Sequence, residues 1–163
     1  MLKKITQIII VVACGCLLYM SGIRADQALG SQQVIQKMVT SVNEKDWPAF
    51  TETMTASERD FYKQYFADNS NTQGIKEVLS MSVCDMQKLD REAVEDELLA
   101  EEYPVLKKSH RIEGYLVTMD CKVTSDHHYF SDGINEFLIV LAEEDGEMRI
   151  VQFQSAGEEL LEQ

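Results

Sequence analysis

The spacing of apolar residues changes about halfway along the chain, and this change restricts the fold more than any other feature. Between Ser31 and Phe66, apolar residues recur three to four positions apart, as on one face of a helix. From Val78 onward they alternate with polar residues, as in half-buried strands. A block of helices followed by a block of strands predicts an α+β protein whose helices pack on one face of a curved antiparallel sheet.

Three helical segments are expected before the sheet begins. The first has Ser31 as its N-cap and ends at the turn-prone residues 43–46. The second is capped by Asp46 and has Pro48 in its first turn, where proline's missing N–H does no harm. The third is capped by Ser57 and carries an aromatic stripe. Aromatic residues of the second and third segments are the candidates for lining a ligand pocket: Trp47, Phe50, Phe61, Tyr62 and Tyr65.

Four strands are expected after the helices. Alternate residues are apolar in Leu79–Val83 and again in Tyr115–Val123, which predicts two strands with one buried face each. The last two strands flank Asp145–Gly146, a pair typical of a two-residue hairpin turn. The run 137–142 is apolar throughout, which predicts a strand packed on both faces. The acidic residues 93–99 predict a short solvated helix that connects the first two strands.

The first 25 residues differ from the rest of the chain. Two lysines precede the run Ile5–Ile23, which is apolar apart from three residues, the order typical of an export signal. Three outcomes fit this segment: cleavage after Ala25, retention as a membrane anchor, or lipidation of Cys14 in the lipobox-like string "VVAC". In all three, the domain of residues 31–157 is expected outside the cytoplasm, secreted or held at the cytoplasmic membrane.

Net charge limits the kinds of partner that the chain can bind, and the cysteine positions limit its possible disulfides and metal sites. The formal net charge of −13 repels nucleic acid and favours solubility or cationic partners. Cys14 and Cys16 lie in the export segment, whereas Cys84 and Cys121 lie in the domain, where either a disulfide between them or two free thiols fits the spacing. No zinc-ligand spacing or cofactor motif occurs in the sequence, so neither a metal nor a cofactor is expected.

The sequence predicts no catalytic residue. Asp120 is a lone acid on a strand and is expected to face solvent, and His110 lies among the basic and polar residues of a loop. Residue types that ligate metals gather in one short segment: Asp126, His127, His128 and Asp132. Neighbouring strand residues point to opposite faces, so at most some of these four side chains could converge on a metal, and the segment is interpreted as a hairpin or loop between long strands. No hydrolase, protease or nucleotide-binding motif is present in the sequence.

Two strings carry a resemblance to a known family. The string "VIQKMVTSVNEKDWPAFTETM" resembles the opening of the NTF2-like superfamily, cone-shaped α+β domains that begin with an amphipathic helix, an Asp-Trp turn and a second helix. The string "DGINEFLIVLAEEDGEMRIVQFQS" is similar to the closing hairpin of exported NTF2-like domains of Gram-positive bacteria, which commonly have tryptophan where this chain has Met148. The resemblance covers Val34 to Ser155, and it implies that Trp47 plugs the junction between helices and sheet.

Two functions are expected from these features. The first is a non-catalytic exported or membrane-anchored module that binds a partner protein, an envelope component or a small ligand in the cone. The alternative is a small pocket enzyme of the isomerase or dehydratase kind, which needs an inward-facing acid or histidine with a polar partner. Similar domains accompany sporulation and cell-wall amidase proteins, which implies an envelope role, and a homodimer through the sheet is a further expectation.

Overall fold

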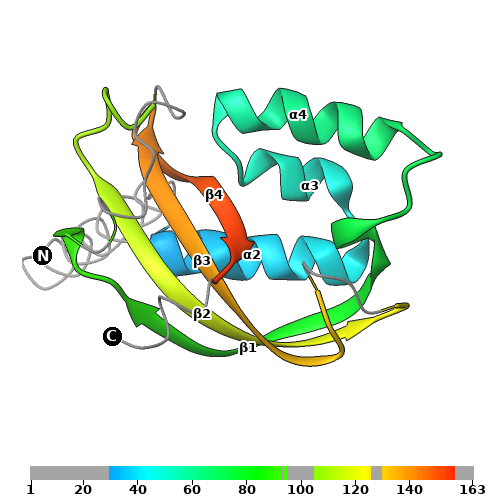
Figure 1. Ribbon diagram of the computed structural model, residues 1–163. Coiled ribbons are helices and arrows are strands. Elements are labelled where there is room, and N and C mark those ends of the chain that lie inside the picture. Colours follow the sequence, from blue (N-terminus) through cyan, green and yellow to red (C-terminus); the bar gives the residue numbers. More distant parts are fainter. Residues whose placement is uncertain (1–29, 93, 95–104, 126–129, 157–163) are drawn as a thin grey trace, which may run out of the picture.

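The computed structural model describes residues 30–92, 94, 105–125 and 130–156. Within them, three α-helices and a short 3-10 helix precede a four-stranded antiparallel sheet, so the predicted α+β class is confirmed (Figure 1). The elements in chain order are α2 (Ser31–Glu44), α3 (Trp47–Glu52), α4 (Ala56–Ala67), η2 (Gly74–Glu77), β1 (Val78–Lys88), β2 (Ile112–Val123), β3 (Gly133–Glu144) and β4 (Glu147–Ser155). The predicted export segment, with Cys14, lies outside the described residues. No helix in the described part has the length and apolar character needed to span a membrane.

The strands lie side by side in the order β1-β2-β3-β4, so each strand pairs with its neighbour in sequence. The predicted hairpin between β3 and β4 is confirmed. Asp145 and Gly146 have φ values of 53° and 82°, and two left-handed residues match the right-handed twist of the strands they join. Glycine takes this conformation without steric cost, which explains why the turn forms at this pair.

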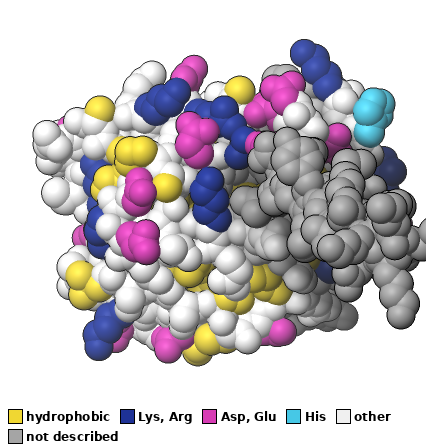
Figure 2. Space-filling view, turned by 180° about the vertical axis from the view of Figure 1, so that it is seen from behind, with side chains coloured by type: hydrophobic (Ala, Val, Ile, Leu, Met, Phe, Trp, Pro, Cys, Tyr) yellow, Lys and Arg dark blue, Asp and Glu magenta, His cyan; other side chains and the backbone are white. Residues whose placement is uncertain are grey.

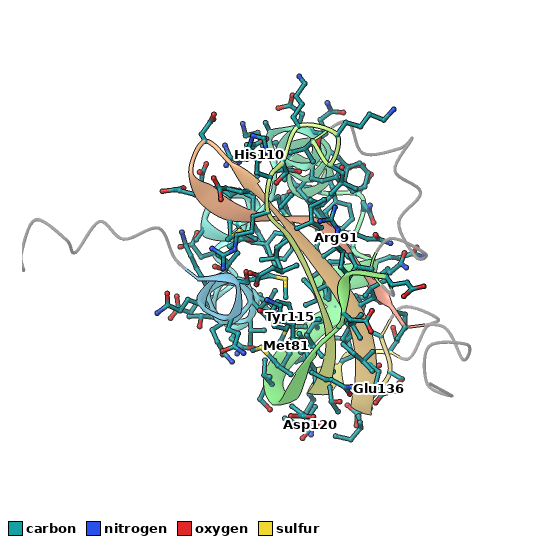
Figure 3. The ribbon with its side chains drawn as sticks, turned by 90° about the vertical axis from the view of Figure 1, so that its left-hand side faces the viewer. Met81, Arg91, His110, Tyr115, Asp120 and Glu136 are labelled. Atoms are coloured by element: carbon teal, nitrogen blue, oxygen red, sulfur yellow. The ribbon has the colours of Figure 1, made fainter. Side chains whose placement is uncertain are left out.

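The larger core lies between α2 and the concave face of the sheet. Helix α2 crosses the sheet and contacts both edge strands, while α3 and α4 lie beyond β4 (Figure 1). Ile35, Met38 and Val42 present the predicted helical stripe and are completely buried. On the sheet side, Tyr115 and Met81 lie between the strands and α2 (Figure 3). Burial of this stripe is what holds the helix layer on the sheet.

A smaller core covers the opposite face of the sheet. Leu138, Val140 and Ala142 of β3 are fully buried there, so the strand that is apolar at every position packs on both faces, as predicted. The connection between β1 and β2 supplies the cover, because Val94 and Leu106 pack against these residues. The prediction that residues 93–99 form a solvated connector was therefore wrong at Val94, which is buried.

Three local predictions were also wrong. Gly30, not Ser31, is the N-cap of α2, because the Ser31 hydroxyl instead donates to the buried Glu113 carboxylate. Thr55 rather than Ser57 is the N-cap of α4. Leu79 is 50% exposed because the register of β1 shifts between Val78 and Ser80, which moves Leu79 out of the buried face.

Candidate functional site: an aromatic hollow beside the edge of β4

A hollow of about 310 Å³ opens between α4, η2 and the end of β4. Its volume is at the small end of the range for ligand pockets. Its walls come from helices and sheet alike: Phe50, Phe61, Tyr62, Tyr65, Gly74, Ile75, Phe130, Phe137, Phe153, Gln154 and Ser155. We call this set the aromatic hollow.

Four of the five predicted pocket residues line the aromatic hollow, and the fifth does not. Phe50 forms part of its buried base, and Phe61 lies at its rim with 60% of its surface exposed. Trp47, the single tryptophan, instead stacks on Phe66, with ring centroids 4.5 Å apart and planes 11° apart. It lines a separate depression with Pro48 and other neighbours, so Trp47 joins α3 to α4 rather than contributing to the hollow.

The sheet contributes an aromatic wall that sequence reasoning missed. Phe130, Phe137 and Phe153 form a cluster in which the ring centroids lie 5.0 to 6.1 Å apart. On the helix side, the Tyr62 ring meets Phe50 edge to face at 5.1 Å. Both groups of rings line the hollow. The inward alternation of β3 and β4 was a signal for Phe137 and Phe153, but only the sheet register brings them together.

One corner of the hollow is held by Tyr65. Its hydroxyl donates to the carbonyl of Gln73, and Lys76 lies over its ring, 4.9 Å from the centroid. Gly74 follows with a φ of 70°, and a Cβ there would come within 3.0 Å of the Tyr65 hydroxyl. Burial raises the pKa of Tyr65, so the phenol stays neutral at physiological pH. Tyr65 thus presents a fixed, uncharged side chain to the hollow.

No acid, histidine, lysine or arginine is among the described residues that line the hollow. Gln154 and Ser155, the other polar residues of the lining besides the tyrosines, are neutral. The lining is therefore suited to holding an apolar or aromatic group.

The structure shows a buried acid that sequence reasoning missed, and it lies away from the hollow. Glu113 is 8% exposed and faces the concave side of β2, paired with Leu141 of β3, whereas the hollow is lined by Phe137 further along that strand. Tyr115 and Ser31 donate to its Oε2 at 2.8 and 2.7 Å. Glu113 lies two residues before Tyr115 on β2, so the two side chains point to the same face of the sheet. Because the sequence predicts that Tyr115 is buried, it could also have predicted that Glu113 faces the core.

Two basic side chains complete the site around Glu113. Arg111 Nε donates to its Oε1 at 2.8 Å, and Lys88 Nζ lies 3.3 Å from the same oxygen. Burial would raise the pKa of this carboxyl, but hydrogen bonds from Ser31, Arg111 and the other partners outweigh it and lower the pKa to about 2. Because the Glu113 carboxylate accepts a hydrogen bond from Ser31, it ties α2 to the sheet. It stays ionised and both of its oxygens are already bonded, so it is a poor general base.

The other acid and histidine candidates do not converge. Asp120 and His110 are both exposed and lie at opposite ends of the sheet, so they form no His–Asp pair (Figure 3). The exposure predicted for both residues is confirmed. The segment 126–128 lies outside the described residues, while the Asp132 carboxylate accepts a hydrogen bond from the Val123 N–H at 3.3 Å. Within the described ranges, no group of three metal-ligating side chains comes together.

Cys84 and Cys121 are free thiols in the structure. Cys121 is buried and pairs with Met81, whereas Cys84 is exposed at an irregularity in the β1–β2 register. The two thiols thus face different environments on neighbouring strands. Burial is the largest cause that raises the pKa of Cys121, to about 11, so its thiol stays protonated.

No family model matches the chain, and no curated protein matches its sequence.

The distribution of charged side chains over one face of the molecule bears on where a partner could bind. On the face shown in Figure 2, acidic and basic side chains are interleaved with small groups of hydrophobic ones. Charge on this face therefore does not single out a binding surface, and the aromatic hollow remains the most distinctive feature of the described residues.

Proposed function

We propose that this chain is a non-catalytic binding module that receives an apolar group of a partner protein, an envelope component or a small ligand in the aromatic hollow. The observation that carries this proposal is the lining: it has aromatic rings from both the helices and the sheet, and no carboxyl or imidazole group belongs to the described residues that line it. Aromatic walls bury apolar surface and stack on flat groups, which provides affinity without chemistry.

The fold and the location of the module are part of the same proposal. An NTF2-like cone is supported by α2 lying across the concave face and by α3 and α4 standing at one side of the opening (Figure 1). Placement outside the cytoplasm is supported by the order of lysines and apolar residues in the first 25 positions. Mass spectrometry of the mature amino terminus tests this part, because cleavage, retention and lipidation give different masses.

The pocket-enzyme alternative has one observation to account for, the inward-facing Glu113. Its carboxylate already accepts hydrogen bonds from Ser31, Tyr115 and Arg111 and lies outside the hollow. A base for isomerisation needs a free lone pair aimed at the substrate and a pKa near working pH. Glu113 has neither property, so we do not favour this alternative.

The neutral fluorophore N-phenyl-1-naphthylamine tests the binding proposal, because its fluorescence rises in apolar surroundings and it carries no charge to be repelled. We expect Phe61→Ala in the full chain to weaken probe binding about fivefold to tenfold, through loss of one aromatic wall contact. Phe61 is 60% exposed, so the substitution leaves the folded core intact.

Ile134→Ala is the matched control, because Ile134 is 63% exposed and does not line the hollow. It removes similar apolar surface from another place on the molecule. Glu113→Gln provides a second comparison, since the pocket-enzyme alternative places this residue in the ligand site and the module proposal does not. Equal probe affinity in wild type and Phe61→Ala, or a larger loss in either comparison variant, would refute the proposal.

A further inference from the structure

The sheet is open, so β1 and β4 each have an outer edge. In an antiparallel ladder, successive residues direct their N–H and C=O groups alternately toward the neighbouring strand and away from it. Outward groups on an edge strand are ready to pair with another extended chain unless something covers them. The two edges of this sheet differ in how far they are covered.

The edge of β1 is covered by α2 and the residue that follows it. The Asn43 side chain donates to the Met81 carbonyl at 2.9 Å and accepts from the Met81 N–H at 2.8 Å. Lys45 Nζ donates to the carbonyl of Val78. A side-chain amide thus replaces both hydrogen bonds that a further strand would make at Met81.

The edge of β4 is covered at the end nearer the hairpin. The Ile150 N–H donates to the Thr53 carbonyl at 2.8 Å, and the Thr55 N–H donates to the Ile150 carbonyl at 2.9 Å. Together these bonds form a parallel bridge between Met54 and Ile150. The edge therefore already accepts one short extended segment of the chain itself.

At the other end of β4, no described residue hydrogen-bonds to the outer edge of the strand. Ala156 donates its N–H to the Glu136 carbonyl at 2.8 Å, which directs its backbone groups toward β3. By alternation, the backbone groups of Ser155 and Phe153 point outward. No hydrogen bond to these outward groups is present among the described residues. Phe153 and Ser155 both line the aromatic hollow, so this stretch of the edge and the hollow are one continuous surface.

We propose that an extended segment of a partner protein adds to the sheet as a fifth strand beside Phe153–Ser155 and places apolar side chains in the aromatic hollow. Phe153 pairs with Ile139, which faces the concave core, so a residue opposite Phe153 on the added strand also points to that side. Side chains on a strand alternate between faces, and the segment therefore carries apolar residues at every second position.

The backbone groups distinguish this occupant from a small molecule. A row of alternating N–H and C=O groups is matched by another extended backbone, which gains affinity from the main chain and specificity from alternate side chains. The formal net charge of −13 adds long-range attraction for a segment with basic flanking residues. This inference rests on the proposed function, because it assigns a partner class to the same hollow.

The test begins with selection of peptides from a random display library against the full chain. We expect the enriched peptides to carry apolar residues two positions apart, with basic residues nearby. The strongest peptide is then synthesised, and its affinity is measured by fluorescence anisotropy for three proteins: wild type, Ser155→Pro and Ser155→Ala. Proline removes the outward N–H and is tolerated on an edge strand, whereas alanine removes the hydroxyl and keeps the N–H.

We expect Ser155→Pro to weaken peptide binding about tenfold, because one backbone hydrogen bond is lost and neighbouring ones are disturbed. We expect Ser155→Ala to weaken it by less than about twofold, because the N–H is retained. A peptide N-methylated at the amides that face β4 gives the same loss without altering the protein, and it decides the question if Ser155→Pro does not fold. The inference is overturned if no peptide is enriched, if enriched peptides lack the alternation, or if Ser155→Pro and Ser155→Ala bind alike.

Two further measurements separate the competing occupants. Concentration-dependent self-association that Ser155→Pro abolishes would make a second copy the occupant and overturn the proposal of a partner segment. Binding of N-phenyl-1-naphthylamine that depends on Phe61, together with peptide binding that ignores Ser155, would retain the proposed function and reject the added strand. If binding of N-phenyl-1-naphthylamine does not depend on Phe61, both the proposed function and the added strand are rejected.

Discussion

Replacing Glu113 with glutamine is expected to destabilise the fold by an amount that depends on pH. The change keeps the size of the side chain but removes its negative charge. That charge pairs with Arg111 and Lys88 and accepts a hydrogen bond from the Ser31 hydroxyl. In the folded state, burial raises the pKa of Glu113, and the hydrogen bonds outweigh it, so the pKa moves from 4.5 to about 2. Because the folded pKa is lowered, the stabilisation is complete above about pH 4.5 and is lost as pH falls toward about 2.

The magnitude follows from the shift and from the exposure of the partners. One pKa unit corresponds to about 1.4 kcal/mol, so the full shift corresponds to about 3 kcal/mol. The Arg111 and Lys88 side chains remain 53% and 56% exposed, and solvent screening reduces the expected loss to about 2 kcal/mol. We therefore expect Glu113→Gln to lower the free energy of unfolding by about 2 kcal/mol near pH 7, and by less than about half of that near pH 3.

Urea unfolding followed by circular dichroism at both pH values measures this difference. Asp120→Asn is the matched control on the same strand, because Asp120 is exposed and its substitution is expected to change stability by less than about 0.5 kcal/mol. Equal stability of wild type and Glu113→Gln near pH 7 would refute the reasoning. A deficit of the same size at both pH values would refute it as well, because it would show that the lost stability is packing and not charge.

Three further outcomes follow from the structure. Gly114→Ala should destabilise by more than about 2 kcal/mol in urea unfolding, because its Cβ would lie 2.4 Å from Val94 Cγ2; an unchanged midpoint would contradict the packing of Val94 on the sheet. Gly146→Ala should cost about 1 kcal/mol, since its φ of 82° strains any side chain, and thermal unfolding measures this. Iodoacetamide should alkylate the exposed Cys84 and spare the buried Cys121, as seen by peptide mass spectrometry without denaturant; equal labelling would contradict the burial of Cys121.

Features with a local cause were predictable. The stripe of Ile35, Met38 and Val42 follows from the period of a helix, and the Asp145–Gly146 turn follows from the φ values that a two-residue hairpin requires. Asp46 caps α3 as expected, accepting a hydrogen bond from the Ala49 N–H at 3.0 Å. Each of these depends on residues within one or two turns of chain.

Features that depend on register were not predictable. The pattern of β1 places Leu79 with the buried residues, but a shift in pairing with β2 moves it to solvent. Ser31 looks like a cap, yet its hydroxyl bonds Glu113 on a strand far along the chain. A local rule fails at both positions because a partner from elsewhere in the fold supplies the stronger interaction.

By itself, the sequence determined the element types, the two-faced burial of β3 and the closing hairpin, because each depends on which side of a short segment is apolar. Tertiary structure alone decided that Phe61 on α4, Phe137 on β3 and Phe153 on β4 share one hollow, and that Trp47 is not part of it. It also decided which stretch of the β4 edge makes no hydrogen bond to another described residue. Such features depend on contacts between distant segments, and the spacing of residues along one segment carries no record of the register at which two segments meet.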